Sequence, residues 1–131
     1  MTSADDRCPC GLPASYDQCC GRFHAGADAP TAELLMRSRY SAFVVGDEAY
    51  LARTWHPDSR PRRIHLGDGR TWTGLDVVAT TGGGLLDQRG TVEFVARHRD
   101  SGGADRRHHE ISDFARVDGR WVYVAGLDGD A

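Results

Sequence analysis

Four cysteines lie within a 13-residue window near the amino terminus, and the rest of the chain contains none. They form two close pairs, Cys8 with Cys10 and Cys19 with Cys20, with eight residues between the pairs. Thiolates grouped in this way are typical ligands of Zn²⁺; a site closed by four ligands is structural, whereas catalytic zinc keeps one position for water. We therefore predict a structural zinc site with four sulfur ligands and His24 as a reserve donor. A redox-active pair at Cys19 and Cys20 and a catalytic zinc are the alternatives.

Two arginines further along the chain could bind an anion. Glu33 lies four residues before Arg37, and on a helix this spacing gives an exposed ion pair of small energetic value. Arg39 has no acidic residue at the same spacing, so its guanidinium could instead hold a carboxylate or a phosphate. A surface ion pair and an anion site both stay open as interpretations of these arginines.

Two more side chains are candidates for proton transfer. His56 precedes Pro57, where it could shuttle protons near neutral pH or fix a loop by hydrogen bonding to the backbone. Glu110 shares one face of an expected strand with Phe114. If that face lines a cavity, burial would raise the pKa of Glu110 and make it a general base. An arginine neighbour such as Arg37 would instead make Glu110 part of a structural ion pair.

Helices are expected in the segment that follows the cysteines. Thr31 is a typical cap for a helix that ends at Gly46, and Asp47 caps a second short helix that stops before Pro57. Apolar side chains recur at helical spacing in the first helix. They are Leu35, Met36, Tyr40, Phe43 and Val44.

The second half of the chain changes to a strand-like pattern, rich in β-branched and aromatic residues. The expected strands cover residues 71–81, 91–99, 108–117 and 121–125. The pair Asp118-Gly119 between two of them is a strong signal for a hairpin turn. Helices followed by antiparallel strands predict an α+β fold, with one sheet wrapped around the helices.

Composition limits the classes of partner and the location. The chain has 131 residues, which suits one domain with a small appendage, and a net charge of −3. All 16 basic residues are arginines and are well mixed with the acidic ones, so we do not expect a nucleic-acid partner. The chain has no apolar run long enough for a membrane span and no signal peptide at its start, and we expect a cytoplasmic location.

The cysteine segment resembles the SEC-C zinc motif, known from the carboxy-terminal tail of the SecA translocation ATPase. The matching residues are Cys8-Pro9-Cys10-Gly11, Tyr16 and Cys19-Cys20-Gly21. The resemblance implies that Cys8, Cys10, Cys19 and Cys20 are the four metal ligands.

The rest of the chain resembles the YchJ family of small bacterial proteins. The matching segments are Arg22-Phe23-His24, residues 35–43, Thr54-Trp55-His56-Pro57, residues 93–96, and His109-Glu110 with Ser112 and Phe114. This resemblance implies a zinc knuckle over residues 1–27, followed by a cone-shaped nuclear transport factor 2-like domain over residues 28–131. It carries no established biochemical activity.

Two functions therefore compete. The first is a binding or adaptor module, which meets a protein partner or a small anionic ligand in the pocket of the cone. The second is an acid/base enzyme (a lyase, isomerase or hydrolase) with Glu110 or His56 as the base and Arg39 orienting the substrate. A deep pocket that joins these three residues would favour the enzyme, and a filled cone with a flat apolar patch near Tyr16 or Phe23 would favour the adaptor.

Overall fold

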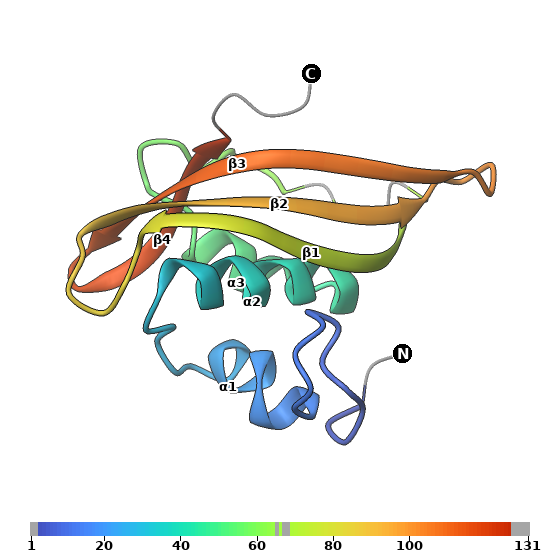
Figure 1. The fold of residues 1–131 in the computed structure, drawn as a ribbon, viewed down its shortest axis with the longest axis horizontal. Coiled ribbons are helices and arrows are strands. Elements are labelled where there is room, and N and C mark those ends of the chain that lie inside the picture. The colour runs from blue at the N-terminus through green and yellow to red at the C-terminus, as the bar shows by residue number, and fades with distance from the viewer. Residues whose placement is uncertain (1–2, 65, 67–68, 127–131) are drawn as a thin grey trace.

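The computed structural model describes residues 3–64, 66 and 69–126. A curved four-stranded antiparallel sheet covers one side of the helix α2 (Ala32–Val45), and the cysteine segment packs on the opposite side of that helix (Figure 1). Helix α2 is therefore shared between two parts of the molecule. This arrangement confirms the predicted α+β fold with a sheet wrapped around helices.

The cysteine segment contains little regular structure. Its elements are a 3-10 turn, η1 (Tyr16–Gln18), and a five-residue helix, α1 (Cys20–His24). Only Phe23 adds a large buried side chain to the four cysteines in this segment. A segment with so few apolar side chains cannot build a core of its own, so it depends on its contacts with α2.

Helix α2 and the short helix α3 (Glu48–Arg53) begin where the caps predicted them. The Thr31 hydroxyl accepts a hydrogen bond from the backbone N–H of Leu34, and the Asp47 carboxylate accepts one from Tyr50. Gly46 ends α2 in the left-handed conformation, with a φ of 80°. The caps fix the length of α2 and hence which of its residues face the sheet.

Gly46 gives a direct test of this boundary. A Cβ added at Gly46 would meet no atom within 4 Å, so Gly46→Ala adds only the cost of a left-handed backbone. We expect this variant to lose about 1 kcal/mol of unfolding free energy. Gly102→Ala, at a glycine without a positive φ, is the matched control and should change less. Urea denaturation of both variants measures the difference, and equal losses would contradict it.

The sheet is a simple meander in the order β1-β2-β3-β4. Its strands are β1 (Thr71–Gly82), β2 (Arg89–Arg99), β3 (Asp105–Val117) and β4 (Arg120–Gly126). Strand β3 begins three residues earlier than predicted because Asp105 pairs with Arg99 of β2. The pairing of β2 with β3 therefore continues through polar residues as far as the turn between them. The Asp118-Gly119 turn is present, and both residues have positive φ, as the hairpin signal requires.

The segment after α3 joins the sheet at one point. The backbone N–H of His56 donates to the carbonyl of Tyr123, and the N–H of Tyr123 donates to the carbonyl of Thr54. This bridge to β4 holds Trp55 beside Tyr123, with their rings 5.1 Å apart.

No helix in the described part of the chain has the length and apolarity of a membrane span.

Candidate functional site

The four cysteines form a compact buried cluster. Their Sγ atoms all lie within 4.8 Å of one another, and the Cys10 and Cys19 sulfurs are 3.7 Å apart. None of the four residues is more than 3% exposed, and all four, which lie in the described part of the chain, carry free thiols. Four soft sulfur donors at such spacing could hold one metal ion.

Backbone hydrogen bonds bring the two pairs together. The N–H of Cys8 donates to the carbonyl of Ala14, and the N–H of Gly11 donates to the carbonyl of Cys8, so the chain turns back between the pairs. Gly11 has a φ of 94°, a conformation that favours glycine. The N–H of Cys19 donates to the carbonyl of Tyr16, which starts the turn that presents the second pair.

Helix α2 closes one side of the thiol cluster. The Ser41 hydroxyl lies 3.6 Å from the Cys8 sulfur, and Arg37 Nη1 donates to the carbonyl of Cys10 over 2.8 Å. The same arginine makes the predicted ion pair with Glu33, at 2.9 Å. Arg37 therefore ties the cysteine segment to α2, a role that its spacing from Glu33 alone does not reveal.

His24, the reserve donor, lies beside the cluster and is engaged elsewhere. Its Nε2 lies 2.8 Å from the carbonyl of Ser38, and its Nδ1 lies 2.5 Å from the Tyr16 hydroxyl. Because a carbonyl can only accept, Nε2 carries the hydrogen, and Nδ1 of the neutral ring accepts from Tyr16. His24 thus connects η1 to α2, and it is not part of the group of four sulfurs.

The thiols influence each other's protonation. Hydrogen bonds from Cys10 and Cys20 lower the pKa of Cys8, whereas burial raises the pKa of Cys19 to about 12. Hydrogen bonds with Cys10 and Cys8 raise the pKa of Cys20. A bound metal would take its ligands as thiolates and displace their protons. The donor set therefore fits a thiolate-binding metal.

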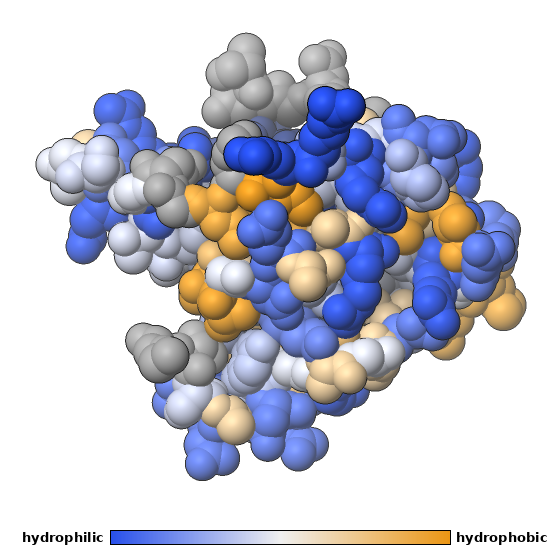
Figure 2. Space-filling model, turned by 180° about the vertical axis from the view of Figure 1, so that it is seen from behind, coloured by the Kyte–Doolittle hydropathy of each residue, from blue (hydrophilic) through white to orange (hydrophobic). Residues whose placement is uncertain are grey.

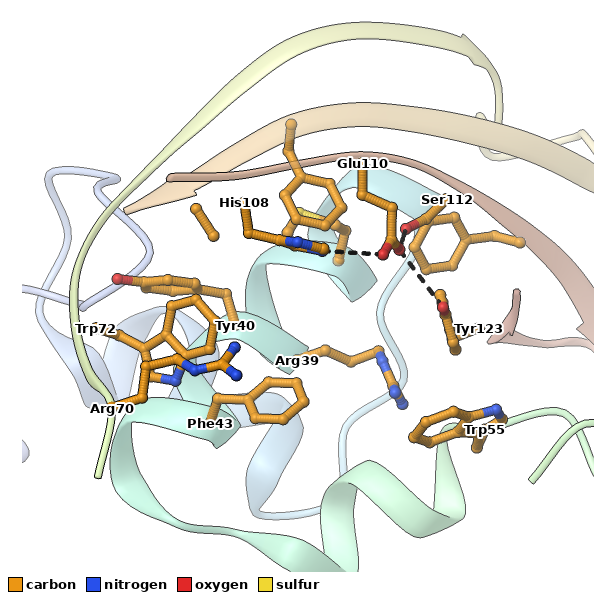
Figure 3. Close-up of a pocket in the computed structure, with 14 residues that line it drawn as sticks. Arg39, Tyr40, Phe43, Trp55, Arg70, Trp72, His108, Glu110, Ser112 and Tyr123 are labelled. Atoms are coloured by element: carbon orange, nitrogen blue, oxygen red, sulfur yellow. Dashed lines mark hydrogen bonds and ion pairs between the residues drawn. The ribbon is translucent and has the colours of Figure 1, made fainter. Parts of the chain in front are cut away.

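A second site lies between α2 and the sheet. It is a cavity of about 210 Å³, walled mainly by aromatic side chains from α2, from the segment after α3 and from all four strands (Figure 3). Its apolar and aromatic lining consists of Met36, Tyr40, Phe43, Trp55, Trp72, Phe94, Ala96, Phe114 and Tyr123. The polar lining consists of Arg39, Arg70, His108, Glu110 and Ser112.

Arg39 is buried at one end of the cavity, with only 6% of its surface exposed. Its Nη1 donates to the carbonyl of Leu51 at 2.9 Å and to the hydroxyl of Thr54 at 2.7 Å. The rings of Trp55 and Tyr123 lie against the guanidinium, with centroids 4.9 and 4.7 Å from Cζ. Burial lowers the pKa of Arg39 to about 10, which leaves it charged at neutral pH.

Glu110 reaches the same cavity from β3, but it does not have the raised pKa expected of a buried base. Burial alone would raise the pKa, yet hydrogen bonds from His108, Ser112 and Tyr123 and the charge of His108 outweigh it and lower the pKa. His108 Nε2 lies 3.1 Å from the carboxylate, and the Tyr123 hydroxyl lies 3.4 Å from it. The prediction of a raised pKa was wrong because it lacked these donors, and the partner is not Arg37.

This network predicts a pH-dependent contribution to stability. Because the pKa of Glu110 is lowered from its ordinary value of 4.5, the unfolded chain binds a proton before the folded protein does. The stabilisation is therefore complete above about pH 4.5 and is lost as the pH falls through the folded-state pKa. We expect Glu110→Gln to be less stable than wild type at pH 7, with a gap that narrows toward pH 3.

Thermal unfolding of both proteins between pH 3 and pH 7 measures this gap. Ser112→Ala removes one of the three donors to Glu110. This variant should also be less stable than wild type at pH 7, by a smaller amount, and its gap should also narrow toward pH 3. A gap that stays constant over the whole range would contradict the role assigned to the Glu110 charge.

His56, the third candidate, is not among the residues that line the cavity. Its Nδ1 accepts a hydrogen bond from the backbone N–H of Asp58 at 3.0 Å, so it fixes the loop. The cavity thus brings together Arg39 and Glu110 but not His56.

Sequence reasoning missed Trp55 and Tyr123 as site residues, because only the bridge between the segment after α3 and β4 places them at the cavity.

The residues proposed for an adaptor surface are not freely exposed. Phe23 is 3% exposed, and Tyr16 is only partly exposed. On the face shown in Figure 2, hydrophobic side chains form separate patches between hydrophilic ones. The large hydrophobic residues that are exposed in the described part of the chain are Val45, Val78, Leu85 and Leu86.

Comparisons with known proteins agree with this architecture. The family model for the middle, NTF2-like domain of YchJ matches residues 31–126. A UPF0225 protein of Streptomyces coelicolor is 57% identical over 120 residues, covering 91% of this chain and 93% of that protein. A UPF0225 protein of Corynebacterium efficiens is 50% identical over 123 residues, covering 93% of each.

Two solved structures share the whole fold. The solution structure of a SEC-C motif-containing protein from Rhodopseudomonas palustris has a TM-score of 0.81 and 34% sequence identity, covering 99% of this chain and 100% of that one. The crystal structure of a SEC-C motif-containing protein from Psychrobacter arcticus has a TM-score of 0.74 and 30% identity, covering 95% of this chain and 82% of that one.

Proposed function

This chain belongs to the YchJ family, and from that premise we propose that it is a small-molecule-binding protein whose NTF2-like cone is supported by a structural zinc knuckle. The observation that carries the proposal is the cavity of about 210 Å³ between α2 and the sheet. A cavity with apolar walls and a few convergent polar groups is the usual form of a ligand site. The space between α2 and the sheet could therefore hold a small ligand.

In this proposal Cys8, Cys10, Cys19 and Cys20 hold Zn²⁺ as a closed four-thiolate site. The ion would supply cross-linking of a segment that lacks a core, and it would leave no position for water or substrate. The mutual distance of the sulfurs, at most 4.8 Å, supports this assignment. The knuckle would occupy residues 1–27 and the cone residues 28–131, in a reducing, cytoplasmic compartment that keeps thiols free for metal.

Binding is better supported than catalysis. Glu110 already accepts three hydrogen bonds and has a lowered pKa, which makes it a weak general base. His56 is held by its loop, away from the lining. An adaptor role through Phe23 is weakened by the burial of that side chain against α2.

The test is a titration of the full-length protein with a set of one-ring aromatic fragments, neutral and anionic, followed by amide NMR spectra. We expect shifts concentrated on the residues that line the cavity. Ala96→Leu, which extends a buried lining side chain into the cavity, should abolish those shifts while the fold is kept. Shifts confined to other surfaces, or unchanged in Ala96→Leu, would refute the cone as the binding site.

A further inference from the structure

The guanidinium of Arg39 is only partly satisfied by the protein. Both hydrogens of its Nη1 are used, by the carbonyl of Leu51 and the hydroxyl of Thr54. Its Nε and Nη2 find no hydrogen-bond acceptor among the described residues, and no carboxylate of those residues lies within ion-pair distance. Neither nitrogen is among the fully buried polar atoms that lack a partner, so both remain accessible to a molecule in the cavity that Arg39 lines.

The unused nitrogens are the two that form one edge of the guanidinium. The rings of Trp55 and Tyr123 lie against the group, and Arg39 lines the cavity (Figure 3). The Nε and Nη2 hydrogens of an arginine point in parallel and match the two oxygens of a carboxylate. The geometry therefore offers a two-pronged donor to whatever occupies the cavity.

The charged side chains of the lining allow an anionic ligand. Among the described residues, the cavity wall carries two arginines, Arg39 and Arg70, and one carboxylate, Glu110. Glu110 does not compete strongly for Arg39, because its carboxylate already accepts from His108, Ser112 and Tyr123. The Nε and Nη2 edge of Arg39 is thus left for the ligand.

Size and wall chemistry limit the rest of the ligand. A water molecule occupies about 30 Å³ in the liquid, so a cavity of about 210 Å³ has room for roughly seven waters. That volume suits a molecule with one ring. At the other end of the cavity, the ring centroids of Tyr40 and Phe43 lie 6.0 and 5.9 Å from that of Trp72, and these three rings favour a flat aromatic body.

We propose that the cone binds a small aromatic carboxylic acid, with the carboxylate held by Nε and Nη2 of Arg39 and the ring against Tyr40, Phe43 and Trp72. This inference rests on the proposed binding function and names its ligand class. Arg39 is thereby a ligand-binding residue, and its bonds to Leu51 and Thr54 serve to aim the free edge.

The experiment compares two acids with two neutral analogues of the same size, on the full-length chain. Benzoate and phenylacetate are the acids, and benzamide and phenylacetamide are the analogues. In wild type, ligand-observed NMR titrations should give dissociation constants at least about tenfold lower for the acids, as expected for hydrogen bonds to charged groups. The Arg39 Nε–H signal should shift with benzoate and not with benzamide.

Variants assign the selectivity to one arginine. Arg39→Gln should lose the preference for acids, Arg39→Lys should keep part of it, and Arg70→Gln, at the other arginine of the same lining, should keep most of it. Far-ultraviolet circular dichroism and thermal unfolding establish that each variant is folded. If Arg39→Gln does not fold, the Arg39 Nε–H signal of wild type provides the test. A shift with benzoate and none with benzamide supports the carboxylate site, and equal shifts with both contradict it.

The outcomes separate this inference from the function on which it rests. Acids and analogues binding equally in wild type, or selectivity lost in Arg70→Gln and kept in Arg39→Gln, would overturn the carboxylate site and leave the binding function standing. If none of the four probes, nor the wider fragment set, shifts the cavity residues of wild type, the binding function itself fails.

Discussion

Replacing Cys10 with serine is expected to release the metal and to lower the melting temperature by roughly 10 °C. Loss of one thiolate opens a site that needs four ligands, and the cysteine segment has no core to keep it folded. Its release from α2 would expose Phe23, whose burial is worth about 1.5–3 kcal/mol. For a chain of this length, each kcal/mol corresponds to roughly 3–5 °C.

Metal content and thermal unfolding of the same preparations test this expectation. Wild type should contain one zinc per chain, and Cys10→Ser should contain much less. Gln18→Ala changes an exposed side chain between the two cysteine pairs and is the matched control, with both values close to wild type. Wild-type protein with no bound metal and four freely titratable thiols would contradict the zinc site.

The second large effect is expected for Phe114→Ala, with a loss of about 3–5 kcal/mol of unfolding free energy. Phe114 is 1% exposed and lies between the core and the cavity, with its ring 5.9 Å from that of Tyr123. Truncation removes the buried ring and leaves a void that the β3–β4 ladder cannot close. The larger cavity should also weaken binding of a one-ring ligand, because the wall behind it is lost.

Urea denaturation compares this variant with two others. Phe114→Leu keeps most of the volume and should lose less than half as much. Leu86→Ala removes a side chain that is 94% exposed, and it should stay within about 0.5 kcal/mol of wild type. A loss below about 1 kcal/mol for Phe114→Ala would show that the core does not depend on this ring.

The elements with local signals could be predicted from the sequence. Thr31, Gly46 and Asp47 set the ends of the helices through contacts within a few residues, and the Asp118-Gly119 turn set the last hairpin. The cysteine cluster was also evident, since its pairs are close in sequence. The boundary between knuckle and cone, at residue 27, stays a prediction.

The electrostatics of the cavity could not be predicted in the same way. Alternation correctly placed Glu110 and Phe114 on one face of β3, but Tyr123 comes from another strand and Trp55 from the segment after α3. The pKa of Glu110 depends on donors from both strands, and the burial of Arg39 depends on the bridge between Tyr123 and His56. Contacts of this range are set by the tertiary fold, which no local pattern encodes.

The position of α2 between the two sites has a consequence for the order of events during synthesis. The four cysteines leave the ribosome before α2 is complete, and about 25 residues separate Cys20 from the end of that helix at Val45. At typical synthesis rates this interval lasts roughly one to five seconds. Since Ser41 and Arg37 close over the thiols only after α2 forms, we expect metal to load most readily in this interval and slowly once the chain is finished.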